Sequence, residues 1–260
     1  MSNRIKNIIG FSLLVVFFIL VSFTKNEQGQ KFVKNVNVVI DAVKGDPFLD
    51  ESDVIDLVYS NYDTLLNKKI NDLSLLEVES LLRTQPSVKN AEVYLENNGK
   101  LTLEIELRKI IARIKPDSLP GFYIDNEGKT MPWVTKYSPR VLTITGYLNS
   151  YSRHKEDKEI IIEKDLSKHT KLVKDVYEFA KYVNSSSFWR AQIGQVYIDS
   201  FGDAILIPLI GNEEFVFGEL SGYRNKLDKI RKYYEEIAPK LGWNLYKEVN
   251  VKFDRQIVCK

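Results

Sequence analysis

The sequence NAEVYLENNGKLTLEIELR, residues 90–108, decides the fold of the first half of the chain. Its apolar residues occupy every second position on both sides of a central turn: Ala91, Val93, Leu95, Leu101, Leu103, Ile105 and Leu107. Strict alternation is typical of half-buried strands, and Asn97-Asn98-Gly99 has the composition of a tight turn. The segment therefore predicts a β-hairpin with one apolar face.

The residues before the hairpin predict one strand and two helices. Apolar and polar residues alternate from Val36 to Ala42, and Gly45-Asp46-Pro47 ends this strand. Asp50 can cap a helix through Ser60. A second helix begins at Ser74, whose hydroxyl can form a capping box with Glu77, and it ends near Thr84. We therefore expect a first domain, residues 34–112, with the element order β-α-α-β-β.

An apolar run from Ile8 to Phe23 predicts a single membrane span. It would cover about 24 Å as a helix, which is close to the thickness of a bilayer's hydrocarbon core. The run lacks the small residues of a signal-peptide cleavage site and the polar face of a core helix. Flanking charges do not decide its orientation. We expect a cytoplasmic tail (1–7), a signal anchor in the lipid bilayer (8–24), a linker (25–33) and exported domains.

Beyond residue 112 the pattern changes to short strands, turns and two helices. We expect a hairpin around the loop 125–128, then strands at 141–144, 195–199, 204–207 and 214–217. Apolar stripes predict helices at 165–184 and 220–237, the second stopped by Pro239 to Gly242. A last alternating stretch, Val249 to Ile257, predicts a terminal strand. The chain is therefore expected to be an α+β protein whose second domain, 113–260, is β-rich and contains two helices.

Composition narrows the functional classes. Aromatic residues make up 12% and hydrophobic residues 44% of the chain, which indicates a packed core. The net charge of +2 includes no block of basic residues, which argues against nucleic acid as a partner. Cys259 is the one cysteine, so no intramolecular disulfide can form, and we interpret it as a small strand residue.

The residues of common catalytic sites are scarce. The two histidines, His154 and His169, lie in Lys-rich polar surroundings, and no spacing fits a zinc site or a Ser or Cys triad. Gly128-Lys129-Thr130 has Tyr123 where a phosphate-binding loop needs glycine. The glutamates 92, 96, 104 and 106 alternate with the apolar set, as solvated charges do, although motifs alone leave a two-carboxylate glycosidase open. We expect no catalytic residue, cofactor or metal.

The segment PSVKNAEV, residues 86–93, resembles the Pro-Trp-Val-x-x-Ala-x-Val signature of the FtsQ (DivIB) family of bacterial cell-division proteins, with Ser87 in place of Trp. The predicted order of a short tail, one span, a POTRA domain of β-α-α-β-β order and a β-rich domain also resembles that family. Residues 123–128 and 249–253 are similar to its hairpin and terminal-strand motifs. The ending, 242–259, is most similar to the Bacteroidetes-type members.

This resemblance implies a non-catalytic scaffold of the divisome, in the inner membrane at the division septum, with its domains in the periplasm. It would hold the bitopic proteins FtsB and FtsL near the septal peptidoglycan synthases FtsW and FtsI. A terminal edge strand, Val249 to Val258, could accept a partner strand. We expect its partner-facing residues to be Lys252, Phe253, Asp254 and Arg255, although Phe253 could equally be a core residue.

The strand from Asn90 to Leu95 in the POTRA domain is a second candidate surface, with Asn90, Val93 and Leu95 as its residues. Val93 is expected to face the core more than the partner. Two other functions remain open from sequence: a membrane-anchored periplasmic enzyme and a POTRA-type envelope assembly factor. The second would need a membrane β-barrel or repeated POTRA units, and neither is visible in the last hundred residues.

Overall fold

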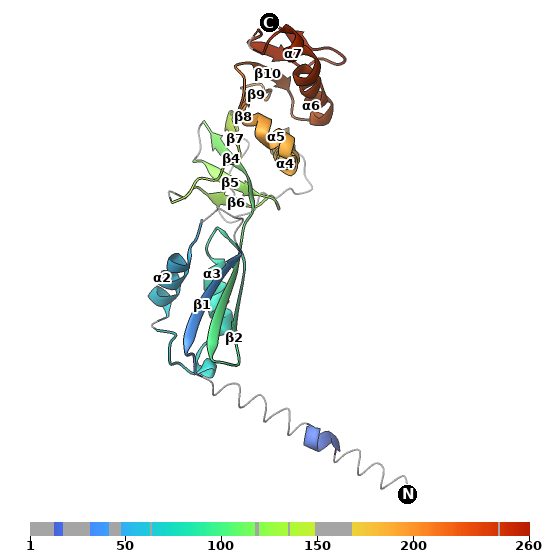
Figure 1. The fold of residues 1–260 in the computed structure, drawn as a ribbon. Coiled ribbons are helices and arrows are strands. Elements are labelled where there is room, and N and C mark those ends of the chain that lie inside the picture. The colour runs from blue at the N-terminus through green and yellow to red at the C-terminus, as the bar shows by residue number, and fades with distance from the viewer. Residues whose placement is uncertain are drawn as a thin grey trace, which may run out of the picture. The chain divides into compact units, whose positions relative to one another are not determined.

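The computed structural model describes residues 13–17, 32–41, 48–62, 64–117, 120–134, 136–148, 168–243 and 245–260. The chain divides into two compact units between Leu107 and Arg108 (Figure 1). The predicted span 8–24 lies outside the described residues except for Leu13–Phe17, which are helical. Within the described ranges, no helix has both the length and the apolar composition that a membrane crossing requires.

The first unit has the predicted β-α-α-β-β order. Its elements are β1 (Asn35–Asp41), α2 (Glu51–Asn61), the short 3₁₀ helix η1 (Ile70–Asp72), α3 (Leu75–Arg83), β2 (Val88–Leu95) and β3 (Lys100–Leu107). The sheet order is β1-β3-β2, with β1 parallel and β2 antiparallel to β3. The alternating apolar residues of the hairpin lie on one face and, apart from half-buried Leu95, are buried together with Val54, Val58, Val78 and Leu82 of the helices. The predicted hairpin is confirmed.

Side-chain caps begin both helices of the first unit where the sequence predicts them. At α2 the cap is reciprocal, because Asp53 N–H donates to Asp50 Oδ1 (3.0 Å) and Asp50 N–H donates to Asp53 Oδ2 (2.9 Å). At α3 the hydroxyl of Ser74 accepts from the N–H of Glu77. Each cap satisfies backbone donors that the first turn of a helix leaves free. The cap positions are therefore readable from sequence.

The second unit is built on one mixed sheet in the order β12-β11-β10-β9-β8-β7-β4-β5-β6. The strands are β4 (Ile110–Pro116), β5 (Phe122–Asp125), β6 (Thr130–Pro132), β7 (Leu142–Gly146), β8 (Ile193–Ile198), β9 (Ala204–Pro208), β10 (Glu214–Gly218), β11 (Glu248–Asn250) and β12 (Val258–Cys259). The helices α4 (Lys168–Ser185), α5 (Ser187–Gln192), α6 (Tyr223–Lys232) and α7 (Ala238–Leu241) run along one side of this sheet in Figure 1.

Two elements of the second unit are absent from the sequence prediction. β4 is buried along most of its length and pairs with β5 and with β7, so its residues do not alternate between apolar and polar. The predicted division after residue 112 falls inside this strand. α5 is a short helix capped by Ser186, whose hydroxyl accepts from the N–H of Trp189. It has too few residues to show a helical period.

The helix predicted at 220–237 differs from the observed one. Gly222, with φ +65°, precedes α6, which passes into a π-helical turn (Tyr233–Ile237) and then into α7. Pro239 lies in the first turn of α7, where a missing N–H costs no helical bond, so the chain stays helical through it and ends later in the predicted stretch from Pro239 to Gly242. Gly242, with φ +111°, ends it. The predicted apolar stripe of α4 is confirmed, because Val176, Phe179, Ala180 and Val183 are buried in the core.

Candidate partner-binding surface

The C-terminal segment forms two short strands in place of the single predicted strand from Val249 to Val258. β11 pairs in parallel with β10 and antiparallel with β12, and residues 252–257 between them form a turn. The alternation of Val249, Val251 and Phe253 ends at the turn, because Val251 is fully buried whereas Phe253 is 49% exposed. The prediction of one continuous strand is therefore wrong, and Phe253 is not a core residue.

Three local contacts explain why the chain turns after β11. The side-chain oxygen of Asn250 accepts from the N–H of Lys252 (3.0 Å), as an Asx turn does. From α6, the Lys229 ammonium donates to the carbonyls of Val251 and Phe253, at 3.0 Å for the first. Arg255 has φ +60°, the left-handed conformation that reverses the chain direction. These contacts hold residues 252–255 in one exposed loop.

A second turn lies beside this loop. Lys252 forms an ion pair with Asp203, which belongs to the turn between β8 and β9. Phe201, two residues earlier in that turn, is 91% exposed, and its N–H donates to Asp199 Oδ1 (2.8 Å). We use the name terminal surface for Phe201, the loop 252–255 and β12. Sequence reasoning missed Phe201, Asp203 and Lys229, since an isolated Phe or one lysine among many carries no positional signal.

β12 is the edge strand of the nine-stranded sheet, so the predicted terminal edge exists but is shorter than expected. Glu248 and Lys260 exchange backbone hydrogen bonds (2.9 and 3.2 Å). Along an antiparallel pair of strands, hydrogen-bonded residue pairs alternate with non-bonded pairs. Cys259 and Val249 form the non-bonded pair next to Glu248 and Lys260, so the N–H and C=O of Cys259 point away from β11. The Cys259 side chain packs against the core, and burial raises the pKa of its thiol. Cys259 is thus a small strand residue, as predicted.

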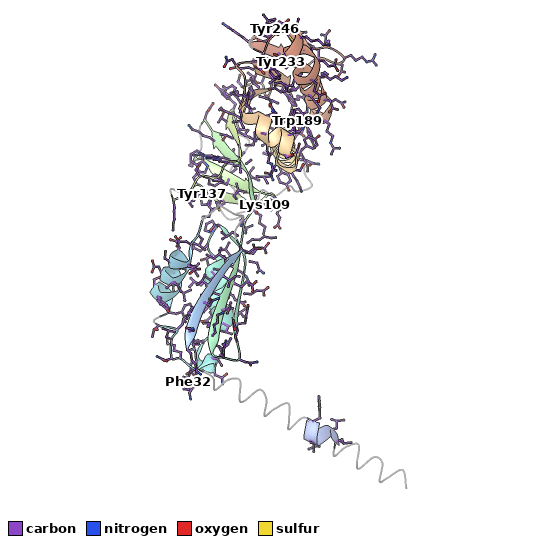
Figure 2. The ribbon with its side chains drawn as sticks, in the orientation of Figure 1. Phe32, Lys109, Tyr137, Trp189, Tyr233 and Tyr246 are labelled. Atoms are coloured by element: carbon purple, nitrogen blue, oxygen red, sulfur yellow. The ribbon has the colours of Figure 1, made fainter. Side chains whose placement is uncertain are left out.

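A group of buried polar residues lies close to the inner side of these strands. Tyr233, in the π-helical turn, is fully buried, and its hydroxyl has no hydrogen-bond partner among the described residues. Burial raises the pKa of Tyr233 to about 12, and the charges of Glu213, Cys259 and Tyr246 add to the effect. Burial and the Glu213 carboxylate also raise the pKa of Tyr234. Figure 2 shows Tyr233 and Tyr246 in this part of the second unit.

The second predicted surface lies on β2 of the first unit. Val93 is 5% exposed and faces the helices, as expected, whereas Asn90 and Leu95 are half-buried. Asn90 lies on the opposite face of the strand from Val93 and Leu95, because neighbouring positions in a strand alternate between faces. The three residues therefore share a strand but not a side-chain surface.

Candidate ligands for metals or catalysis do not gather in the described part of the chain. No grouping of three or more His, Cys, Asp or Glu side chains that could hold a metal ion occurs among the described residues. His154 lies outside those residues, and His169 belongs to α4 but its side chain is not described. The four glutamates of the hairpin are exposed or half-buried on the open face of the sheet.

Comparison with known protein families accounts for both units. Residues 31–106 match a family model described as a POTRA-like domain, and residues 109–260 match one described as FtsQ/DivIB, C-terminal related. No curated protein matches the chain. The second match covers more than half of the sequence and includes every residue of the terminal surface. The chain therefore belongs to the FtsQ/DivIB family of cell-division proteins.

Proposed function

We propose that the protein is a non-catalytic divisome scaffold that binds an extended segment of an FtsB-like protein along β12. The supporting observation is the short edge strand at the end of the family-matched unit, flanked by an exposed loop. An unpaired strand edge offers main-chain donors and acceptors to an incoming strand, and neighbouring side chains supply selectivity. Through this partner and an FtsL-like protein, the scaffold would be coupled to septal peptidoglycan synthases of the FtsW and FtsI type.

The chemistry of the terminal surface defines the partner segment. Phe253 and Phe201 offer apolar contact area, and Arg255 is an exposed cation without an ion pair among the described residues. Lys252 already pairs with Asp203, so it holds the loop more than it attracts a ligand. The segment we propose is therefore extended, with an apolar residue for the phenylalanines and a carboxylate for Arg255. Asp254 would disfavour a second carboxylate nearby.

The first unit and the apolar run have supporting roles in this proposal. The run 8–24 would anchor the chain in the inner membrane with both units in the periplasm, where single-span partners can meet it. The β2 strand, predicted to act through Asn90, Val93 and Leu95, would contribute a second contact used in recruitment to the septum through the side-chain face that carries Asn90, because Val93 packs against the helices of its own unit. A chain lacking residues 35–107 should then fail to reach the division site, and normal septal localisation of that chain would contradict this role.

Partner capture from native membranes tests the main contact. The full chain is purified in detergent with its bound proteins, alongside the variants Phe253→Asp and Arg255→Glu. Arg140→Glu is the matched control, because Arg140 is an exposed arginine of the same unit outside the terminal surface. We expect both loop variants to lose the FtsB-like protein and the control to retain it. Full capture by loop variants with an unchanged circular dichroism spectrum would refute the site.

A further inference from the structure

The outer edge of β2 is occupied by side chains of α3. Glu96 N–H donates to the Lys100 carbonyl (2.9 Å), so by alternation the backbone groups of Ala91 and Val93 point away from β3. The outward N–H of Val93 donates to Glu79 Oε1 (3.0 Å). The outward carbonyl of Ala91 accepts from Arg83 Nη2 (2.6 Å). Two groups that an added strand would need are therefore already bonded.

The two side chains form a unit of their own. Glu79 and Arg83 are one helical turn apart on α3, and their charged groups approach to 3.6 Å. Val78 and Leu82 next to them are buried against the sheet, which fixes the face of α3 that lies along β2. The carboxylate meets a backbone donor and the guanidinium meets a backbone acceptor. The pair thus matches the hydrogen-bonding pattern of an adjacent strand.

We propose that Glu79 and Arg83 form a clasp that closes the β2 edge against strand pairing with a second copy of this chain. Ala91 and Val93 are buried against the helices of their own unit, so an unprotected β2 would offer a second copy its outward row of backbone donors and acceptors. Antiparallel pairing of two β2 strands centred on Val93 would place Ala91 opposite Leu95. It would also place Glu92 opposite Tyr94, which avoids the repulsion of two facing glutamates. This proposal concerns the first unit and does not rest on the partner contact at β12.

A charge swap separates the clasp from an ordinary helix ion pair. In the full chain carrying Glu79→Arg together with Arg83→Glu, the helix keeps both charges and an i,i+4 pair. Arginine at 79 cannot accept from Val93 N–H, and glutamate at 83 cannot donate to the Ala91 carbonyl. The matched double variant Glu79→Gln with Arg83→Lys keeps one acceptor and one donor. Glu77→Ala, an exposed position of the same helix, controls for loss of helix charge.

Two measurements read the state of the edge. Hydrogen exchange at the Val93 amide, in dilute monomeric samples, should be at least about tenfold faster in the swap than in the wild type, because a bond to a charged acceptor is lost. Sedimentation in detergent at increasing protein concentration should show a dimer of the swap, with Val93 protected again. The Gln/Lys and Glu77→Ala variants should remain monomeric.

The outcomes that would overturn the proposal are equally defined. If the Val93 amide hydrogen exchanges in the charge-swap variant at the wild-type rate, Glu79 and Arg83 do not close the edge. If exchange accelerates but the swap stays monomeric over the concentration range, a second copy is not the occupant. Capture of another protein's strand in place of self-association would overturn the same claim. Since the terminal surface is unaltered in all variants, partner capture at β12 reports separately on the proposed function.

Discussion

Replacing Lys229 with Met should loosen the loop that carries Phe253 and Arg255. The ammonium donates to two carbonyls, those of Val251 and Phe253, and methionine keeps most of the apolar stem. Water can replace the bond to Phe253, which is exposed, but not readily the bond to buried Val251. We therefore count one hydrogen bond from a charged donor, about 1.5 kcal/mol of the unfolding free energy.

For a unit of this size, that loss corresponds to a decrease in Tm of roughly 3–6 °C, measured by calorimetry on the full chain. Lys232→Met is the matched control, because Lys232 is an exposed lysine of the same helix. Hydrogen exchange should accelerate in residues 251–257 and leave β8 and β9 unchanged. If Lys229→Met and the control have the same Tm and the same exchange in the loop, the contact does not hold the loop in solution.

Three further changes test other parts of the second unit. Cys259→Pro removes the outward N–H of the edge strand and should weaken partner capture at least about fivefold. Cys259→Ala keeps that N–H and should capture the partner as the wild type does. Equal capture by the two variants would contradict strand addition at β12. The pKa of Tyr233 is about 12 in the fold against 10.0 for the free side chain, so the neutral hydroxyl contributes fully to the unfolding free energy below pH 10, and up to about 3 kcal/mol is lost as pH rises toward 12. Tyr233→Phe should therefore show a smaller decrease in unfolding free energy at alkaline pH than the wild type. An identical decrease in the two proteins would exclude this cause. Asp125→Ala should lower the unfolding free energy, measured with urea, by about 3–5 kcal/mol. The buried Asp125 carboxylate accepts from Arg108 (2.9 Å) and from the N–H groups of Glu127 (2.9 Å) and Lys129 (2.8 Å). A loss below about 1 kcal/mol would contradict this role.

The fold was predictable where a periodic pattern coincided with a local signal. The hairpin 90–108 has both alternation and an Asn-Gly turn, and α2 and α3 each begin at a capping side chain. β4 failed this criterion, because pairing on both sides and burial on both faces remove the polar positions that reveal a strand. The turn at 252–257 was missed for the opposite reason. Alternation continues through it, and the lysine that bends the chain comes from a helix more than twenty residues away.

The partner-binding role of the candidate residues stays a prediction, and their geometry was not predictable from the sequence. Lys252, Phe253, Asp254 and Arg255 were predicted as neighbours on a strand, whereas the structure gathers them in a loop beside the edge. Their relation to Phe201 and Asp203 depends on sheet order, which no local pattern encodes. Glu79 and Arg83 have the spacing of an ordinary surface ion pair. Their hydrogen bonds to β2 depend on the placement of α3 along that strand, which the spacing does not predict.

The two edge strands β2 and β12 differ in what an incoming strand would meet. At β2 it would have to displace a carboxylate and a guanidinium that already bond Val93 N–H and the Ala91 carbonyl. At β12 the outward groups belong to Cys259, next to an exposed loop that presents an aromatic ring and a cation. Displacing two charge-assisted bonds costs free energy that pairing at β12 does not require. Strand addition by a partner should therefore occur at β12, and a chain with the swapped clasp should pair with a second copy of itself at β2 while partner capture at β12 stays unchanged.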